Sequence, residues 1–179
     1  MAEEKKENWF TYMALTTILI AVTATLSTFK GGGFSTRSLL NQTKASDQWS
    51  YFQSKSIKSY IFDMRRENLE LQMESLENQK GNEALVSRYR DKIEQYKKNI
   101  QKYEEEKEVI KKDAEGFENL RDESKKHSEK FGIAVIFLQI SILLSSIATL
   151  SKKKFVWYSS LILGVLGILY FLDGFFLFF

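Results

Sequence analysis

Apolar residues fall alternately three and four positions apart through residues 86–117. A helix whose apolar positions recur every 3.5 residues on average keeps one stripe facing a partner helix, which is the pattern of a coiled coil. This stripe, called the tyrosine seam below, consists of Val86, Tyr89, Ile93, Tyr96, Ile100, Tyr103, Ile110, Ala114 and Phe117. Lys107 interrupts it once. The tyrosines predict a partly open seam, because each hydroxyl needs a partner or water.

Three apolar blocks lie outside this charged region. Each reaches the roughly 20 residues that a helix needs to cross about 30 Å of hydrocarbon. The predicted segments are a short N-terminal tail (1–8), a first transmembrane helix (9–29), a glycine-rich linker (30–34), a first coiled-coil arm (35–80), a turn (81–82), a second arm (83–130), a second transmembrane helix (131–150), a basic loop (151–154) and a third transmembrane helix with an aromatic tail (155–179). The fold class is therefore an all-α membrane protein.

The two arms are predicted to form a long antiparallel hairpin between the first two transmembrane helices. Three consecutive glycines at 31–33 indicate a helix end, and Ser35 or Thr36 can cap the next helix. Gly81 and Asn82 suit a turn, because glycine adopts left-handed backbone conformations and asparagine caps helices. The arms are nearly equal in length, as a hairpin that leaves and rejoins one membrane face requires. Each arm spans roughly 70 Å at 1.5 Å per residue.

The first arm carries a less regular stripe, broken by Arg65 and Arg66. Its members are Trp49, Phe52, Ile57, Tyr60, Ile61, Met64, Leu69, Met73 and Leu76. One interpretation makes this arm the hairpin partner of the tyrosine seam. The alternative lays its first half along lipid headgroups as an interfacial amphipathic helix. We favour the hairpin, because a flat first half leaves much of the second arm without a partner.

Charged pairs of alternating sign follow the outer face of the second arm. They are Lys97 and Lys98, Glu104 and Glu105, and Lys111 and Lys112. A neighbouring copy displaced by one heptad, about 10.5 Å, would set lysines against glutamates. The simpler interpretation is a solvated face held by pairs one helical turn apart, each contributing a few tenths of a kcal/mol.

Polar residues within the apolar blocks are the candidate intramembrane contacts. Thr17, Ala21 and Thr25 form a row of small residues that favours close helix approach. Gln139 lies near the middle of the second block and needs a hydrogen-bond partner. Asp173 follows enough apolar residues to reach the far membrane interface.

Composition narrows the range of possible chemistry. The chain has no cysteine, which excludes disulfides, thiol catalysis and cysteine-ligated metals, and it has no proline to interrupt a helix. The single histidine, His127, lies in a run of charges, and the triple glycine lacks the other residues of a phosphate-binding loop. A net charge of +3 gives no indication of nucleic-acid binding. We therefore expect no enzyme activity, no cofactor, no metal site and no nucleic-acid partner.

The stretch at residues 44–58, KASDQWSYFQSKSIK, resembles the signature of a bacterial membrane-protein family known only as a domain of unknown function, DUF4337. The resemblance extends over most of the chain, since members share an N-terminal span, a charged helical middle and a C-terminal hydrophobic pair. It implies a location in the bacterial inner membrane and supplies no activity.

Polar and aromatic side chains alternate within this stretch, at Asp47, Gln48, Trp49, Phe52 and Gln53. On a helix buried on one side, the polar members are predicted to form a hydrogen-bonded layer that fixes the register between arms or subunits.

Two classes of function fit these expectations. The first is a membrane-anchored scaffold that self-associates into a homo-oligomer, with the lipid bilayer, itself and other membrane proteins as partners. The alternative is a channel or transport-associated subunit in which Gln139 and threonines of the first span line a path. Lysines in the short loop 151–154 and at Lys5 and Lys6 predict a cytoplasmic N-terminus and an external hairpin.

Overall fold

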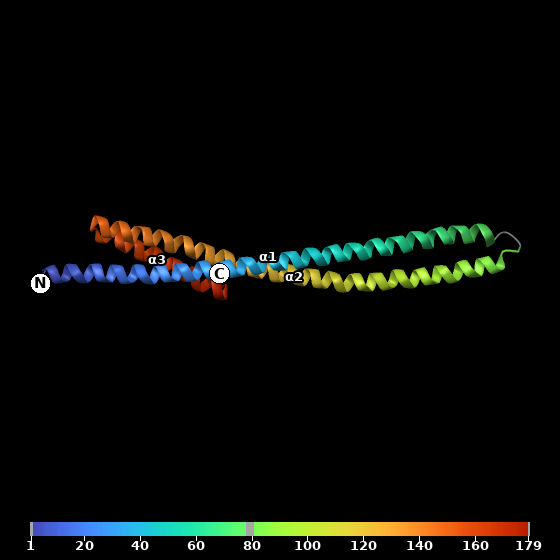
Figure 1. Cartoon of the computed structure of the whole chain (residues 1–179), viewed down its shortest axis with the longest axis horizontal. Coiled ribbons are helices and arrows are strands. Elements are labelled where there is room, and N and C mark those ends of the chain that lie inside the picture. Colours follow the sequence, from blue (N-terminus) through green and yellow to red (C-terminus); the bar gives the residue numbers. More distant parts are fainter. Residues whose placement is uncertain (1, 78–80, 179) are drawn as a thin grey trace. The chain divides into compact units, whose positions relative to one another are not determined.

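The computed structural model describes the backbone of residues 2–77 and 81–178 and the side chains of residues 9–76 and 81–178. The described chain is all-α and has three helices, α1 (Ala2–Glu77), α2 (Glu83–Ser151) and α3 (Lys154–Phe176) (Figure 1). Each helix contains a stretch that is long and apolar enough to cross a membrane. The apolar stretches coincide with the three blocks recognised in the sequence.

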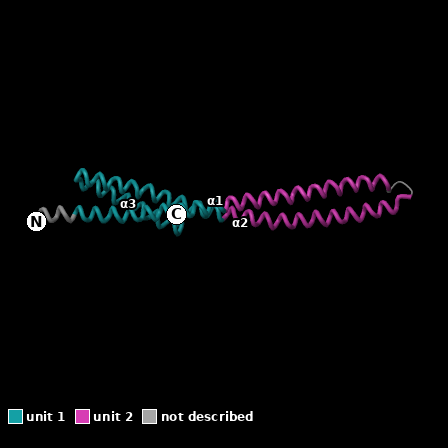
Figure 2. The backbone as a smooth tube through the Cα atoms, in the orientation of Figure 1, with its two compact units in different colours: residues 1–40, 120–179 teal, residues 41–119 magenta. Residues whose placement is uncertain are grey.

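The chain divides into two compact units (Figure 2). One, the three-helix unit, comprises residues 1–40 and 120–179 and contains all of α3 with parts of α1 and α2. The other, the hairpin unit, comprises residues 41–119. The candidate contacts of the sequence analysis are therefore distributed over two separate bodies.

The glycine-rich segment 30–34 is helical, so the predicted linker and the new helix start at Ser35 or Thr36 are wrong. Packing at Gly31 supports the helix through this segment, in which each glycine costs up to about 1 kcal/mol relative to alanine. A Cβ atom at Gly31 would lie 3.0 Å from Phe131 Cβ, and the Ser128 hydroxyl donates to the Gly31 carbonyl over 3.0 Å. Gly31 thus permits a close approach between α1 and α2.

At the predicted turn, α2 begins at Glu83, and the Asn82 carbonyl accepts hydrogen bonds from the N–H groups of Leu85 and Val86. Gly81 has a φ of 102°, a conformation that favours glycine. The end of the predicted first arm, residues 78–80, lies outside the described residues.

Within the hairpin unit, α1 and α2 pack against each other through the tyrosine seam. Ile93, Ile110 and Ala114 are buried, and the remaining members of the seam are half-buried. The Phe62 ring of α1 packs beside Tyr96 and Tyr103, with ring centroids 5.6 and 5.8 Å apart. The spacing of the seam therefore predicts the face of α2 that contacts α1.

The irregular stripe of the first arm separates into two faces of α1. Trp49, Phe52, Leu69, Met73 and Leu76 are half-buried. Ile57, Tyr60, Ile61 and Met64 are exposed. The apolar stripe of the first arm is irregular in the sequence because residues of an inner stripe, which contacts α2, alternate with residues of an outer, exposed stripe.

Candidate functional site

Serine and glycine residues set the distance between α2 and α3 in the three-helix unit. The Ser141 hydroxyl donates to the Ser160 carbonyl over 2.7 Å, and the Ser160 hydroxyl donates to the Ser141 carbonyl over 2.8 Å. A Cβ atom at Gly167 would lie 2.7 Å from Leu138 Cγ and 3.1 Å from the Leu138 backbone nitrogen. At Ser160 and Gly167 the two helices approach so closely that only small residues fit on α3.

The apolar part of α1 joins this packing through Thr17. Its hydroxyl is hydrogen-bonded to the Ser145 hydroxyl of α2 and donates to the Met13 carbonyl. Of the other residues in the predicted small-residue row, Ala21 is half-buried and Thr25 is exposed. The row therefore starts at the contact with α2 and turns outward along α1.

Asp173, near the end of α3, is fully buried and paired with Lys130 of α2. Its Oδ2 atom lies 2.9 Å from Lys130 Nζ, and its Oδ1 atom accepts a hydrogen bond from the Phe178 N–H over 2.6 Å. Its carbonyl accepts from the N–H of Leu177, whose φ of 51° ends the helix in the left-handed region. A carboxylate removed from water needs such partners to stay ionised. Asp173 therefore fastens the C-terminal segment to α2.

Aromatic residues of all three helices pack together next to Lys130 and Asp173 in the sequence. Phe131 is fully buried, and its ring centroid lies 5.0 Å from that of Phe175 and 5.9 Å from that of Phe34. His127 Nδ1 lies 2.8 Å from the Gly174 carbonyl oxygen. Because a carbonyl oxygen only accepts, this ring nitrogen carries the proton. The three helices are thus locked together where the apolar stretches meet the charged ones.

Two open cavities lie beside the α1–α2 contact, and we call them together the outer groove. It contains a cavity of about 410 Å³ near one end of the apolar stretches and a cavity of about 350 Å³ near the other. The residues that line these cavities include Ala14, Ile18, Thr28 and Gly32 of α1 and Gly132, Ser146 and Thr149 of α2. A Cβ atom at Gly32 or Gly132 would meet no other atom within 4 Å. The groove can therefore accept further side chains.

Gln139 belongs to the same face of α2 as the outer groove. It lies seven residues after Gly132 and seven before Ser146, and seven residues make almost two full turns. It is exposed and forms no side-chain hydrogen bond with the described residues. By contrast, the hydroxyls of Thr25, Thr28 and Ser146 donate to carbonyls four residues earlier in their own helices. Gln139 therefore presents an amide on this face of α2 that is not hydrogen-bonded to the described residues.

In the hairpin unit the structure disperses the polar layer expected around Trp49. The Trp49 indole N–H donates to a Glu118 carboxylate oxygen over 2.9 Å. Phe52 lies at its side, with ring centroids 5.6 Å apart. Gln48 is half-buried, whereas Asp47 and Gln53 are exposed. The aromatic residues therefore contact α2, and the polar residues lie on several faces of α1.

The alternating charged pairs of α2 are divided between the hairpin contact and the exposed surface. Lys97 Nζ lies 3.9 Å from a Glu70 carboxylate oxygen of α1, and Glu104 accepts hydrogen bonds from Ser59 of α1 and from Lys107. The other members of these pairs are exposed or half-buried, namely Lys98, Glu105, Lys111 and Lys112. One residue of each of the first two pairs thus holds the hairpin.

The ion pair between Lys55 of α1 and Glu106 of α2 was not among the predicted contacts. Its nitrogen and oxygen atoms lie 2.6 Å apart. The hydrogen bond raises the pKa of Lys55 and lowers the pKa of Glu106 from their ordinary values. No periodic signal marks this pair, because charged residues occur all around both helices. Lys130 was also missed, although it is the last basic residue before the second apolar block and an obvious candidate to neutralise Asp173.

Among the residues that the structure describes, no group of three or more His, Cys, Asp or Glu side chains is placed to hold a metal ion. A family model described as Domain of unknown function (DUF4337) matches residues 9–177. Comparison with curated proteins and with solved structures gives no match.

Proposed function

The chain belongs to the family described as Domain of unknown function (DUF4337), and we propose that it is a membrane-anchored helical scaffold that self-associates through the outer groove. In this proposal the three apolar stretches cross the inner membrane of a bacterium, and the hairpin is a coiled coil that carries the contacts with partners. No catalytic step is involved. The lysines of the loop 151–154 favour a cytoplasmic loop and an external hairpin.

The exposure of Gln139 is the observation that carries the proposal. In a bilayer, no water is present at mid-depth to satisfy a side-chain amide, so an amide facing lipid is unfavourable by several kcal/mol. A second copy supplies the missing partner, because an amide both donates and accepts. Measured hydrogen bonds between membrane helices contribute about 0.6–2 kcal/mol each.

The outer groove provides the shape for this association. Helices in membranes associate where small residues let their backbones approach, and the groove offers exposed glycine at both Gly32 and Gly132. The hydroxyls of Thr28, Ser146 and Thr149 in the groove donate to carbonyls of their own helices, so a second copy can cover these three groups without leaving them unpaired.

The test is the particle mass of the full chain in lipid nanodiscs, measured for the original protein and for Gly32→Leu and Gln139→Leu. We expect Gly32→Leu to shift the population toward monomer by filling the groove, and Gln139→Leu to weaken association. Gly33→Leu is the matched control, because a Cβ atom there also meets nothing within 4 Å and the residue lies outside both groove cavities. Equal masses for all four proteins would refute the proposal.

A pore is the second candidate function, favoured by the exposed position of Gln139 on α2. If several copies surround an axis through this face, Gln139 lines a polar path. Ion flux in reconstituted liposomes that Gln139→Leu abolishes would support the pore. If the protein is oligomeric and the ion flux equals that of empty liposomes, the pore is refuted and the scaffold is the one candidate function left.

A further inference from the structure

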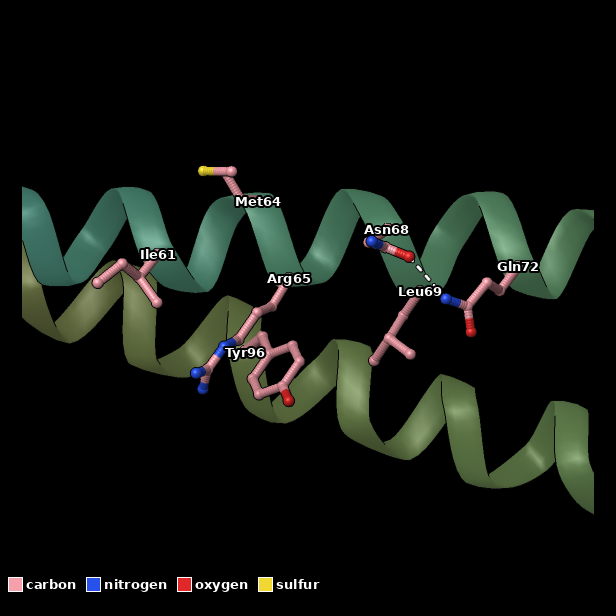
Figure 3. Close-up of a pocket in the computed structure, with 7 residues that line it drawn as sticks. All are labelled: Ile61, Met64, Arg65, Asn68, Leu69, Gln72 and Tyr96. Carbon is pink, nitrogen blue, oxygen red and sulfur yellow. Dashed lines mark hydrogen bonds between the residues drawn. The ribbon is translucent and has the colours of Figure 1, made fainter.

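The hairpin unit has a second apolar stripe on the face of α1 that points away from α2. Ile57 is 54% exposed, and Met64 and Leu71 are each 70% exposed. Figure 3 shows Met64 pointing away from α2 while Leu69 points toward it. Contiguous exposed apolar side chains outside a membrane segment mark an interaction surface.

This stripe, called the outer seam, has the spacing of a coiled coil. Its members are Ile57, Ile61, Met64, Asn68, Leu71 and Ser75, which are spaced alternately four and three residues apart and are all exposed. Ile57, Met64 and Leu71 then occupy the d positions, and Asn68 occupies a central a position. Because the tyrosine seam already packs on the opposite face of α1, the outer seam requires another helix.

We propose that residues 57–75 of α1 pair with the same residues of a second copy as a parallel two-stranded coiled coil. This inference rests on the proposed self-association of membrane-anchored copies. Copies inserted in one bilayer in the same orientation direct their α1 helices the same way, so equivalent residues meet in register. Asn68 then faces Asn68 of the second copy, the position at which a buried asparagine fixes register and favours two strands.

The charges that flank the outer seam favour the parallel pairing. One edge is acidic, with Glu67 and Glu74, and the other is basic, with Lys58 and Arg65. In a parallel pair Glu67 of one helix lies opposite Gln72 of the other, so no like charges face each other across the seam. An antiparallel pair places like edges together, which is unfavourable.

Side chains at the rim of the outer seam suit the same partner. A cavity of about 490 Å³ is lined by residues of α1 and by Tyr96 of α2 (Figure 3). In the parallel register, Tyr60 of the second copy lies opposite Arg65 at this rim and can stack on its guanidinium. Asn68 Oδ1 already accepts from Gln72 Nε2 over 2.6 Å, which leaves the Asn68 amide to donate to the second copy.

The seam is short, and an isolated pair of such helices is marginally stable. Anchoring in a shared membrane raises the effective concentration of one seam near another, so the pairing needs little intrinsic affinity. This dependence makes the full chain in lipid the appropriate sample for a test.

Because the chain has no cysteine, single cysteines can be introduced and oxidised in liposomes containing the full-length protein. We expect disulfide-linked dimers for Ile61→Cys, Met64→Cys and Leu71→Cys, and at least fivefold fewer for Gln101→Cys, an exposed position on α2. Mixing Ile61→Cys with Leu71→Cys distinguishes the orientations, because a positions pack against d positions in an antiparallel pair. A parallel pair gives mainly 61–61 and 71–71 links, whereas an antiparallel pair that sets Met64 opposite Asn68 gives mainly 61–71 links.

The proposal is overturned if the seam cysteines link no more than Gln101→Cys, or if the mixed link predominates. Its failure is distinct from failure of the outer groove. If Gly32→Leu lowers the particle mass while the seam cysteines do not link, only the outer seam is wrong. If the seam cysteines link in register while Gly32→Leu leaves the mass unchanged, the groove is wrong and the seam stands.

Discussion

Replacing Gly167 with alanine tests the claim that small residues fix the distance between α2 and α3. The added Cβ atom would lie 2.7 Å from Leu138 Cγ and 2.8 Å from Leu138 Cδ2, whereas ordinary contacts begin at 3.4 Å. Rotation of the Leu138 side chain can relieve these two contacts in part. The third contact, 3.1 Å to the Leu138 backbone nitrogen, can be relieved only by moving the helices apart.

Two opposing effects set the change in the free energy of unfolding for Gly167→Ala. Overpacking a tight interface costs about 1–3 kcal/mol. The higher helix propensity of alanine returns up to about 1 kcal/mol. We therefore expect a net loss of about 1–2 kcal/mol for Gly167→Ala. Gly33→Ala meets no atom within 4 Å, so it gains the propensity term alone and should stabilise the protein by about 0.5–1 kcal/mol.

Both variants can be followed by thermal unfolding in detergent with intrinsic tryptophan fluorescence. Trp157 is a suitable reporter because its indole N–H contacts the Thr16 hydroxyl at 3.4 Å, across the contact between α3 and α1. The predicted shifts have opposite signs, downward for Gly167→Ala and upward for Gly33→Ala. A shift of the same sign in both, or no loss at Gly167, would refute the reasoning.

Four further tests address the ion pairs and the aromatic contact. Lys130→Met should destabilise the three-helix unit by about 3–5 kcal/mol, because it leaves Asp173 buried and unpaired. Adding Asp173→Asn should recover most of this loss in the same fluorescence assay. Equal melting temperatures for the single and double variants would contradict a stabilising Lys130–Asp173 ion pair. The contribution of the Glu106 carboxylate to the stability of the hairpin is fully present above its ordinary pKa of 4.5 and is lost as pH falls through its lowered pKa. Acid should therefore lower the melting temperature of the hairpin, measured by circular dichroism. Glu106→Gln should reduce this pH dependence. The contribution of the Lys55 ammonium to the stability of the hairpin is present below its ordinary pKa of 10.5 and is lost as pH rises through its raised pKa. Alkaline pH should therefore lower the melting temperature of the original protein, and Lys55→Met should remove this effect. Trp49→Ala should reduce oligomer yield more than membrane insertion, as judged by the amount in the membrane fraction, and an unchanged oligomer would remove Trp49 from assembly.

The sequence predicted the elements that depend on a repeated pattern. The tyrosine seam identified the face of α2 that meets α1, because a helix face that packs on a partner places an apolar residue every three or four positions in the sequence. The apolar blocks identified the three stretches that can cross a membrane, because length and hydropathy are properties of the sequence alone.

The remaining features depend on contacts between distant residues. The three glycines at 31–33 suggest a helix end, because their low helix propensity is visible in the sequence. The contact of Gly31 with Phe131, which compensates for it, joins residues one hundred positions apart and is not. The pairing of Asp173 with Lys130 joins residues from different helices. The outer seam was hidden because its residues interleave with an inner stripe, and only their exposure separates the two.

The central claim is that this chain self-associates in the membrane, and the mass of the full-length protein in lipid nanodiscs tests it most directly. We expect a mass that is a multiple of the 20.9 kDa chain and that falls toward 20.9 kDa for Gly32→Leu but not for Gly33→Leu. A single 20.9 kDa chain for the original protein across the accessible concentration range would contradict it.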